Sequence, residues 1–249
     1  MAIVLQCEKL TKSFEGLIAV KNVSYALEEG VLSVIIGPNG SGKTTFVNLL
    51  SGAIPASEGR ILLHGHDITK LQCYERVKLG IGRTFQLTNI FRGLTVIENV
   101  IIGLVRWQQG SLAKFMLSSF RKDVRIVEEA KRILVETHLF SEKDALASNI
   151  PNGSQRRLEI AVCLSTKPKV VLLDEPMAGL TAEEMEQMVR FINEDLATKH
   201  VILVIEHRLG AIMKLADRIT VMRQGSMIIS GTPEEVKNSI LAQEAYLGK

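Results

Sequence analysis

Apolar residues fall into short runs that are separated by segments with helical spacing. A short apolar run predicts a strand, and an unbroken one predicts a strand that is buried on both faces of a sheet. The runs that favour strands lie at 2–10, 21–27, 31–36, 59–65, 170–173 and 201–205. Helical spacing follows the third of them, at 43–50. Strands that alternate with helices in this way predict an α/β fold.

Capping boxes mark the start of two further helices. Thr181 followed by Glu184 predicts a helix that continues to about Asp195, because the two side chains satisfy free N–H groups reciprocally. Thr232 and Glu235 repeat the device, with a proline at the first helical position between them.

The middle of the chain differs from both ends. Residues 88–165 have a helical pattern, and within them 106–132 carry seven Lys or Arg against three Asp or Glu. We therefore expect a helical insertion at 88–165 in a core formed by 1–87 and 166–249. The basic stretch predicts either a face toward anionic lipid headgroups or membrane subunits, or a solvated helical face.

Composition restricts the possible functions only modestly. The chain has 249 residues, enough for one large domain or a domain with an insertion. Its net charge of +3 argues against a nucleic-acid partner. Three dispersed cysteines without metal spacing favour a reduced, cytosolic compartment. We expect neither a signal peptide nor a membrane span, because the sequence lacks a sufficiently long apolar run.

The segment GPNGSGKT, Gly37–Thr44, carries the most specific chemistry. It follows a buried strand and opens a helix, which is the context of a phosphate-binding loop. Its glycines let backbone N–H groups point at phosphates. Lys43 supplies a cation for the β- and γ-phosphates, and Thr44 supplies a hydroxyl for Mg²⁺. The alternative is a glycine-rich turn without a ligand.

Acidic and imidazole groups follow two buried strands. Asp174 and Glu175 follow the run at 170–173, and Glu206 and His207 follow the run at 201–205. Ligands of open parallel sheets bind at such strand ends. We interpret Asp174 as a Mg²⁺ ligand, through water, and Glu175 as the group that orients or deprotonates water. Solvated carboxylates and a surface histidine are the alternatives.

Two other features allow a ligand. The turn before 152–161 exposes N–H groups at a helix start, which suits an anion. His64 and His66 share one face if 59–65 continues as a strand, and could then bind a metal, although a hairpin is the more ordinary interpretation.

Together these residues resemble the nucleotide-binding subunit of an ATP-binding cassette (ABC) transporter over essentially the whole chain. The resemblance implies a P-loop NTPase (RecA-like) core with an N-terminal antiparallel β region and a helical insertion. It implies ATP hydrolysis, with ATP and Mg²⁺ as cofactors. Phe14 would stack on adenine, although a lone loop aromatic is otherwise interpreted as local core. The expected contacts of the ATP phosphates are Gly37, Pro38, Asn39, Gly40, Ser41, Gly42, Lys43, Thr44 and Thr45.

The resemblance also assigns the remaining site residues. Gln86 matches the Q-loop glutamine, which reaches Mg²⁺ and the transmembrane partner, and 177–180 matches the D-loop at the dimer seam. The implied Mg²⁺ ligands are Thr44, Gln86 and Asp174. The implied catalytic residues are Lys43, Gln86, Glu175 and the switch histidine His207.

The segment NGSQRR lies at the family's signature position, where LSGGQ is usual. In the family this helix faces the γ-phosphate held by a second subunit, so Asn152, Gly153 and Ser154 are expected to contact ATP in trans. Pro151 replaces the family's serine and has neither hydroxyl nor N–H. We expect an impaired composite site, unless Asn152 or Ser154 replaces the lost donor.

The segment at 80–103, the long basic insert and the C-terminal AYLGK resemble the importer subfamily for branched-chain amino acids, and within it the longer of two ATPase subunits. Expected partners are a second ATPase subunit, identical or not, two permease subunits and, indirectly, an external solute-binding protein. The expected location is the cytoplasmic face of the inner membrane, through the permeases. Urea, amide, other amino-acid and lipopolysaccharide transporters have similar cassettes.

Three other classes remain as alternatives. A soluble ABC ATPase of DNA repair or translation usually has a long coiled coil or two cassettes in one chain. A P-loop kinase does not account for the signature helix, Gln86 and the His207 strand together. A regulatory cassette with weak hydrolysis is suggested by Pro151, but Glu175 and His207 argue against it.

Overall fold

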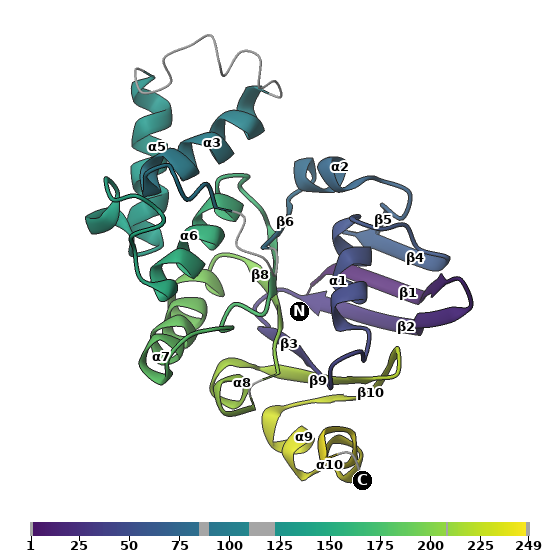
Figure 1. Cartoon of the computed structure of the whole chain (residues 1–249). Coiled ribbons are helices and arrows are strands. Elements are labelled where there is room, and N and C mark those ends of the chain that lie inside the picture. The colour runs from purple at the N-terminus through teal and green to yellow at the C-terminus, as the bar shows by residue number, and fades with distance from the viewer. Residues whose placement is uncertain (1, 85–89, 110–122, 208, 248–249) are drawn as a thin grey trace.

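The computed structural model describes residues 2–84, 90–109, 123–207 and 209–247. Two sheets and the surrounding helices form the molecule (Figure 1). The strands are β1 Ile3–Phe14, β2 Leu17–Glu28, β3 Ser33–Ile36, β4 Glu58–Leu63, β5 His66–Asp67, β6 Ile81–Arg83, β7 Val170–Asp174, β8 Val201–Ile205, β9 Arg218–Arg223 and β10 Ser226–Gly231. The helices are α1 Lys43–Ser51, α2 Cys73–Lys78, α3 Val96–Gln109, α5 Val124–Glu136, η2 Phe140–Glu142, α6 Asn152–Leu164, α7 Ala182–Arg190, η3 Phe191–Leu196, α8 Leu209–Leu215, α9 Pro233–Asn238 and α10 Ile240–Leu247.

The larger sheet is six-stranded, with the order β10-β9-β3-β8-β7-β6. Its strands pair in parallel from β6 to β9, and only β10 is antiparallel to its neighbour. The unbroken apolar runs become β3, β7 and β8 in its centre, where helices and the second sheet cover the two faces. The predicted α/β fold is therefore confirmed.

Alternate side chains of these strands enter two different apolar clusters. Val34, Val171 and Val204 belong to the cluster that includes residues of α3, α5, α6 and α7. Ile35 and Leu172 belong to the cluster that includes α1 and the strands of the smaller sheet. Because strand side chains point alternately to the two faces, one apolar run supplies both cores.

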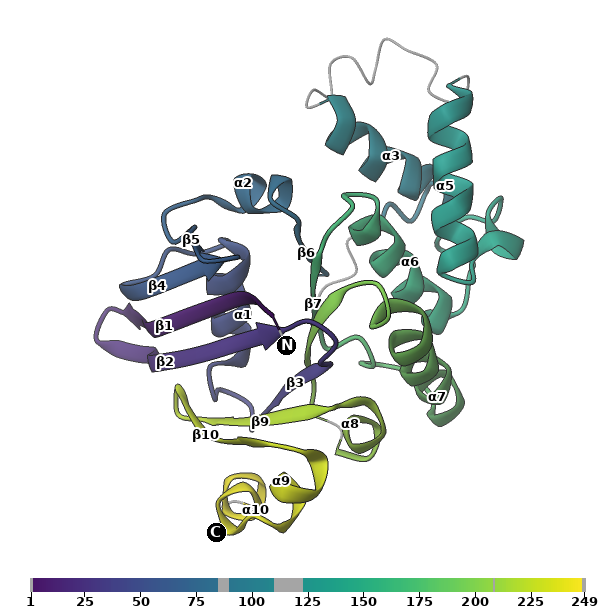
Figure 2. The same cartoon turned by 180° about the vertical axis from the view of Figure 1, so that it is seen from behind.

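The smaller sheet is four-stranded and antiparallel, with the order β2-β1-β4-β5. It matches the expected antiparallel β region. Helix α1 lies between the two sheets (Figure 2) and buries Phe46, Val47, Leu49 and Leu50 there. The start of α1 is thereby held against the ends of β3 and β7, which positions the loop before it.

Helices α3, α5 and α6 occupy the predicted helical insertion, and α3 and α5 extend away from the larger sheet (Figure 1). One apolar cluster joins these helices to β3, β7 and β8. The boundaries of the helical unit at 88–165 and of the core at 1–87 and 166–249 stay a prediction.

Three local features resolve or differ from what the sequence predicted, and the first is the hairpin that is the preferred interpretation at His64 and His66. Strand β4 ends at Leu63, and His64 lies in a left-handed turn with φ of 47°, so His64 and His66 flank a hairpin and do not share a strand face. The helix after Thr181 ends at Arg190 and continues as a π-helical segment to Leu196. The sequence patterns also missed the hairpin of β9 and β10.

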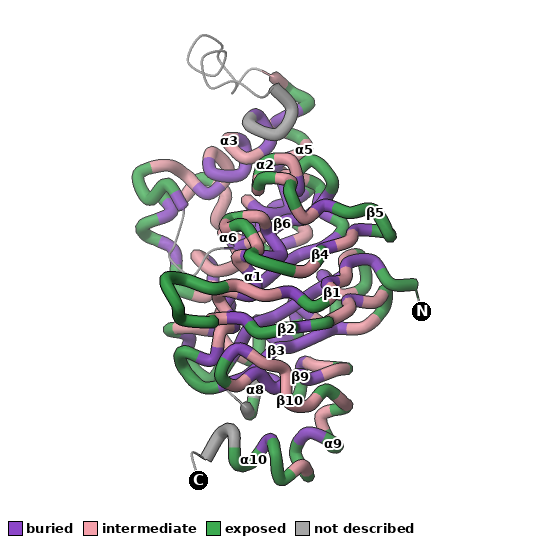
Figure 3. The backbone as a smooth tube through the Cα atoms, turned by 90° about the vertical axis from the view of Figure 1, so that its right-hand side faces the viewer, coloured by how far each residue is buried: buried purple, intermediate pink, exposed green. Residues whose placement is uncertain are grey.

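Burial concentrates in the strands and their covering helices, whereas α9 and α10 carry mostly exposed residues (Figure 3). Within the described ranges, none of the helices is both long enough and apolar enough to cross a bilayer. The three cysteines are free, and burial raises the pKa of the Cys7 and Cys163 thiols to about 12.

Candidate functional site

A glycine-rich loop between β3 and α1 forms the floor of the site. Gly42 has φ of 104°, a conformation that favours glycine, and a Cβ there would lie 2.3 Å from the Ala19 carbonyl oxygen. A Cβ at Gly37 would lie 2.1 Å from the Met222 carbonyl oxygen. The loop thus runs against β2 and β9 at distances that exclude a side chain at these two positions.

Lys43 is the first residue of α1, and its side chain folds back over the loop. Its Nζ donates to the carbonyl oxygens of Gly37 at 2.8 Å and Pro38 at 3.0 Å. Burial lowers the pKa of Lys43, and the carboxylates of Glu175 and Asp174 oppose that shift. The loop therefore places a buried cation beside two acidic groups.

A cavity of about 820 Å³ lies over this loop. Its lining brings together segments that are far apart in the sequence: Phe14, 39–45, Glu175, His207, Gln224 and Gly225. Phe14 is 44% exposed, and Lys12 Nζ lies 4.9 Å from the centre of its ring. Phe14 therefore lies at the rim of this cavity and is not part of the apolar core, so its ring is accessible for stacking against a base.

Asp174 is the last residue of β7 and is buried. Its Oδ2 lies 3.0 Å from Nη2 of Arg83, and its backbone N–H donates to the Thr84 hydroxyl. Its Oδ1 is buried and has no hydrogen-bond partner among the described residues. Burial raises the pKa of Asp174, and the Arg83 guanidinium opposes the shift.

Glu175 and His207 extend from neighbouring strands toward each other. Glu175 has φ of 51°, and its backbone N–H donates to the Ile205 carbonyl oxygen at 2.9 Å. Glu175 Oε1 lies 3.9 Å from His207 Nδ1. The left-handed turn directs this carboxylate out of the strand and into the cavity that His207 also lines.

Glu206 comes directly before His207, and no role was predicted for it. Its Oε1 accepts the N–H of Met177, and its Oε2 accepts the N–H of His207, both at 3.0 Å. The side chain is fully buried. Glu206 therefore joins the segment at 177–180 to the histidine, because one carboxylate is bonded to both backbones.

The helix at the predicted signature position begins at Asn152, with exposed Pro151 as its N-cap residue and no side-chain cap. The N–H of Gly153 donates to Glu184 Oε1 at 3.1 Å. Ser154 is 4% exposed, and its hydroxyl donates to Glu142. That hydroxyl is engaged within the chain in this conformation, whereas Asn152 is exposed.

Of the described residues that line the 820 Å³ cavity, none comes from 151–154. One chain therefore holds the phosphate loop and the signature segment at separate places. Gln86, predicted as a Mg²⁺ ligand and catalytic residue, lies outside the described residues. The sequence patterns missed Arg83, Gln224 and the contact of Glu184 with Gly153, because all three depend on contacts between distant segments.

Comparison with known proteins identifies the chain. The family model described as ABC transporter matches residues 20–178, more than half of the sequence. This chain belongs to the ABC transporter family. The chain also matches a crystal structure of the ADP conformation of an ATP-binding cassette of an ABC transporter, with a TM-score of 0.90, 33% identity and 100% coverage of both chains.

Curated relatives of this ABC cassette cover nearly its full length. It is 38% identical to the high-affinity branched-chain amino acid transport ATP-binding protein LivG of Escherichia coli (strain K12), over 99% of this chain and 98% of the relative. It is 36% identical to a probable branched-chain amino acid transport ATP-binding protein LivG of Archaeoglobus fulgidus, over 98% and 95% respectively. The suspected family and the P-loop NTPase fold are confirmed.

Proposed function

We propose that this cassette is the ATP-hydrolysing subunit of an importer for branched-chain amino acids. One observation supports it most: a single cavity collects Lys43, Thr44, Glu175 and His207 from three separate segments. The names of the relatives supply the cargo class. Weak hydrolysis in a regulatory role fits this cavity less well, because Glu175 and His207 both line it.

The residues of the cavity fit ATP with Mg²⁺. Phe14 offers a ring at the rim for the base, and the stretch 39–45 offers the Lys43 cation and backbone donors for phosphates. Asp174 Oδ1 lacks a partner among the described residues, so the carboxylate can accept a hydrogen bond from Mg²⁺-bound water. Thr44 and Asp174 would hold the ion, with Gln86, and it would neutralise phosphate charge.

The chain's own groups then carry the reaction. Lys43 stabilises the charge that develops on the γ-phosphate. Glu175 orients the attacking water and accepts its proton, while His207, 3.9 Å away, contacts the γ-phosphate. Glu206 fixes the backbone of His207 and of 177–180 together, so a change at the phosphate is transmitted to the D-loop.

A second ATPase subunit, identical or a shorter sister, completes the site. The 820 Å³ cavity has no contribution from 151–154 among its described lining residues, and the signature helix presents its N-terminus elsewhere on the chain. Two chains arranged head to tail would bring Asn152 and Gly153 to the partner's γ-phosphate. ATP then holds the pair together, and hydrolysis separates it.

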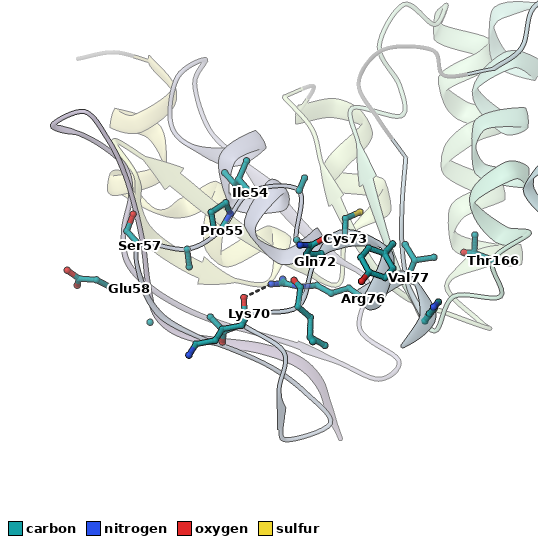
Figure 4. Close-up of a pocket in the computed structure, with 18 of the residues that line it drawn as sticks. Ile54, Pro55, Ser57, Glu58, Lys70, Gln72, Cys73, Arg76, Val77 and Thr166 are labelled. Carbon is teal, nitrogen blue, oxygen red and sulfur yellow. Dashed lines mark hydrogen bonds between the residues drawn. The ribbon is translucent and has the colours of Figure 1, made fainter. Parts of the chain in front are cut away.

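A larger groove is the proposed contact with the permeases. It has a volume of about 1470 Å³ and extends from 52–59 across α2 to Val162 and Thr166 of the helical region (Figure 4). Arg76 supports its floor by donating to the carbonyl oxygens of Leu49 and Leu50 at the end of α1. A permease helix in this groove would place the cassette at the cytoplasmic face of the inner membrane.

Reconstituted transport tests the proposed function. We expect proteoliposomes that contain this chain, a sister ATPase, the two permeases of a branched-chain amino acid importer from the same organism and its solute-binding protein to accumulate leucine, with ATP supplied on the cassette side. Lys43→Ala should abolish uptake, because the phosphates lose their cation. ATP-driven uptake of urea without uptake of leucine would contradict the cargo and keep the ATPase role. ATP hydrolysis without any transport would contradict the importer role.

Pro151 gives a second prediction. A hydrogen bond to a charged group contributes roughly 1.5–3 kcal/mol, so the missing serine weakens the closed pair by roughly ten- to a hundredfold. We expect Pro151→Ser to raise the ATPase rate of the assembled complex several-fold, measured as phosphate release. Pro151→Ala is the matched control, because it restores the N–H without the hydroxyl. An unchanged rate in the serine variant would remove the idea of an impaired site.

A further inference from the structure

We propose that Arg83 is a positioning residue for ATP hydrolysis, which holds one carboxylate oxygen of Asp174 and leaves the other available to the Mg²⁺ site. This inference rests on the proposed role of Asp174. Arg83 does not contact the nucleotide cavity, since it is absent from the described residues that line it. Its proposed effect on the Mg²⁺ site is transmitted by its contact with Asp174.

The contact is built into the larger sheet. Arg83 is the last residue of β6 and Asp174 the last residue of β7, and the two strands are parallel neighbours. Nη2 of Arg83 lies 3.0 Å from Oδ2 of Asp174, with side-chain exposures of 7% and 0%. An ion pair at this depth is little screened by water, so the guanidinium fixes the carboxylate strongly.

The second arm of the guanidinium reaches the phosphate-loop helix. Nη1 of Arg83 donates to Oδ1 of Asn48 and, at 3.1 Å, to Oγ of Ser51. Both acceptors lie on α1, which begins at Lys43. One planar group thus links α1, the helix that carries the phosphate-binding lysine, to Asp174 at the end of β7.

The geometry leaves Asp174 with two distinct oxygens. Oδ2 is bonded to Arg83, while Oδ1 has no hydrogen-bond partner among the described residues. The backbone N–H of Asp174 donates to the Thr84 hydroxyl at 3.3 Å, so the main chain is fixed as well. A carboxylate held at one oxygen keeps a single orientation, which preorganises the free oxygen for a cation.

Arg83 also lines a small cavity next to the permease-side groove. A small cavity of about 240 Å³ is lined by Arg83 together with Val77, Val162 and Thr166. The same three residues line the 1470 Å³ groove. Arg83 therefore lies between a small cavity that shares part of its wall with the proposed permease groove and the carboxylate of the Mg²⁺ site.

ATP affinity with and without Mg²⁺ tests this role on the isolated full-length chain. Isothermal titration with ATP in MgCl₂ and in EDTA, in a Glu175→Gln background that does not consume the nucleotide, gives the factor by which Mg²⁺ tightens binding. We expect Arg83→Met to reduce that factor about tenfold or more, as for a lost hydrogen bond to a charged group. Arg83→Lys, which keeps the cation, should recover part of it.

Arg76→Met is the matched control. Arg76 is more deeply buried beside α1 and bonds backbone carbonyls rather than an acid, so its loss should lower the melting temperature and leave the Mg²⁺ factor unchanged. The inference fails if Arg83→Met keeps the Mg²⁺ factor of the parent, so that its ATP affinities in MgCl₂ and in EDTA fall equally. If Arg83→Met does not fold, an undiminished factor in Arg83→Lys overturns it. No ATP binding by the parent in either buffer would instead contradict the proposed function.

Discussion

Glu175→Gln is expected to lower the ATP turnover of the assembled complex about a hundredfold or more, while ATP stays bound. General-base catalysis contributes roughly 10²–10⁴-fold. Glutamine has the shape of glutamate but cannot take the proton of water. It also removes a negative charge from the cavity that the phosphates would enter, so binding should be retained or tightened. ATP-bound dimers should accumulate, because the step that separates them is blocked.

Phosphate release and size-exclusion chromatography with ATP measure the two effects separately. Glu183→Gln is the matched control: Glu183 is an exposed glutamate in the first turn of α7 and does not line the nucleotide cavity. Its variant should hydrolyse ATP as the wild type does. Turnover near the wild-type rate in Glu175→Gln would contradict the assigned role of Glu175.

Gly42→Ala is expected to destabilise the fold by roughly 2–5 kcal/mol. A left-handed conformation costs a non-glycine residue about 1–2 kcal/mol. The added Cβ would also lie 2.3 Å from the Ala19 carbonyl oxygen, and overpacking costs roughly 1–3 kcal/mol more. The loop must then move away from β2, and the phosphate donors move with it. Urea unfolding of the purified chain measures the loss.

Gly40→Ala separates the two causes of that loss. Gly40 has φ of 78°, also left-handed, but a Cβ there meets no heavy atom within 4 Å. We expect this variant to lose only the conformational part, about 1–2 kcal/mol. Equal losses in the two variants would mean that contact with β2 does not restrict the loop.

The parts of the site that could be predicted from sequence are those encoded by contiguous residues. The phosphate loop is one segment, and Asp174, Glu175 and His207 lie within two residues of the end of a buried apolar run. Strand order then brings them together, because β7 and β8 are parallel neighbours. The position of each residue after an apolar run was sufficient to predict these site residues, because they lie at the ends of β7 and β8.

The rest of the site depends on long-range contacts that leave no local pattern. Arg83 is paired with a residue 91 positions away, and Glu184, which the sequence indicated as a helix cap, also bonds Gly153, 31 positions earlier. The two histidines at 64 and 66 show a case in which the preferred interpretation, a hairpin, is the one that the structure adopts. Their spacing suggested one face, but a turn between β4 and β5 separates them. The assignments of Asn152, Gly153 and Gln86 stay predictions.

The hydrogen bond from Gly153 to Glu184 has a consequence for assembly. In the single chain, the leading end of α6 already holds an anionic group, the same Glu184 carboxylate that caps α7 through Thr181. Under the proposed head-to-tail arrangement, an incoming γ-phosphate would have to displace that carboxylate. Association of two chains then exchanges one negative ligand of the Gly153 amide for another. In a single cassette the Glu184 carboxylate occupies this amide, and it is released only when a second cassette brings its bound ATP.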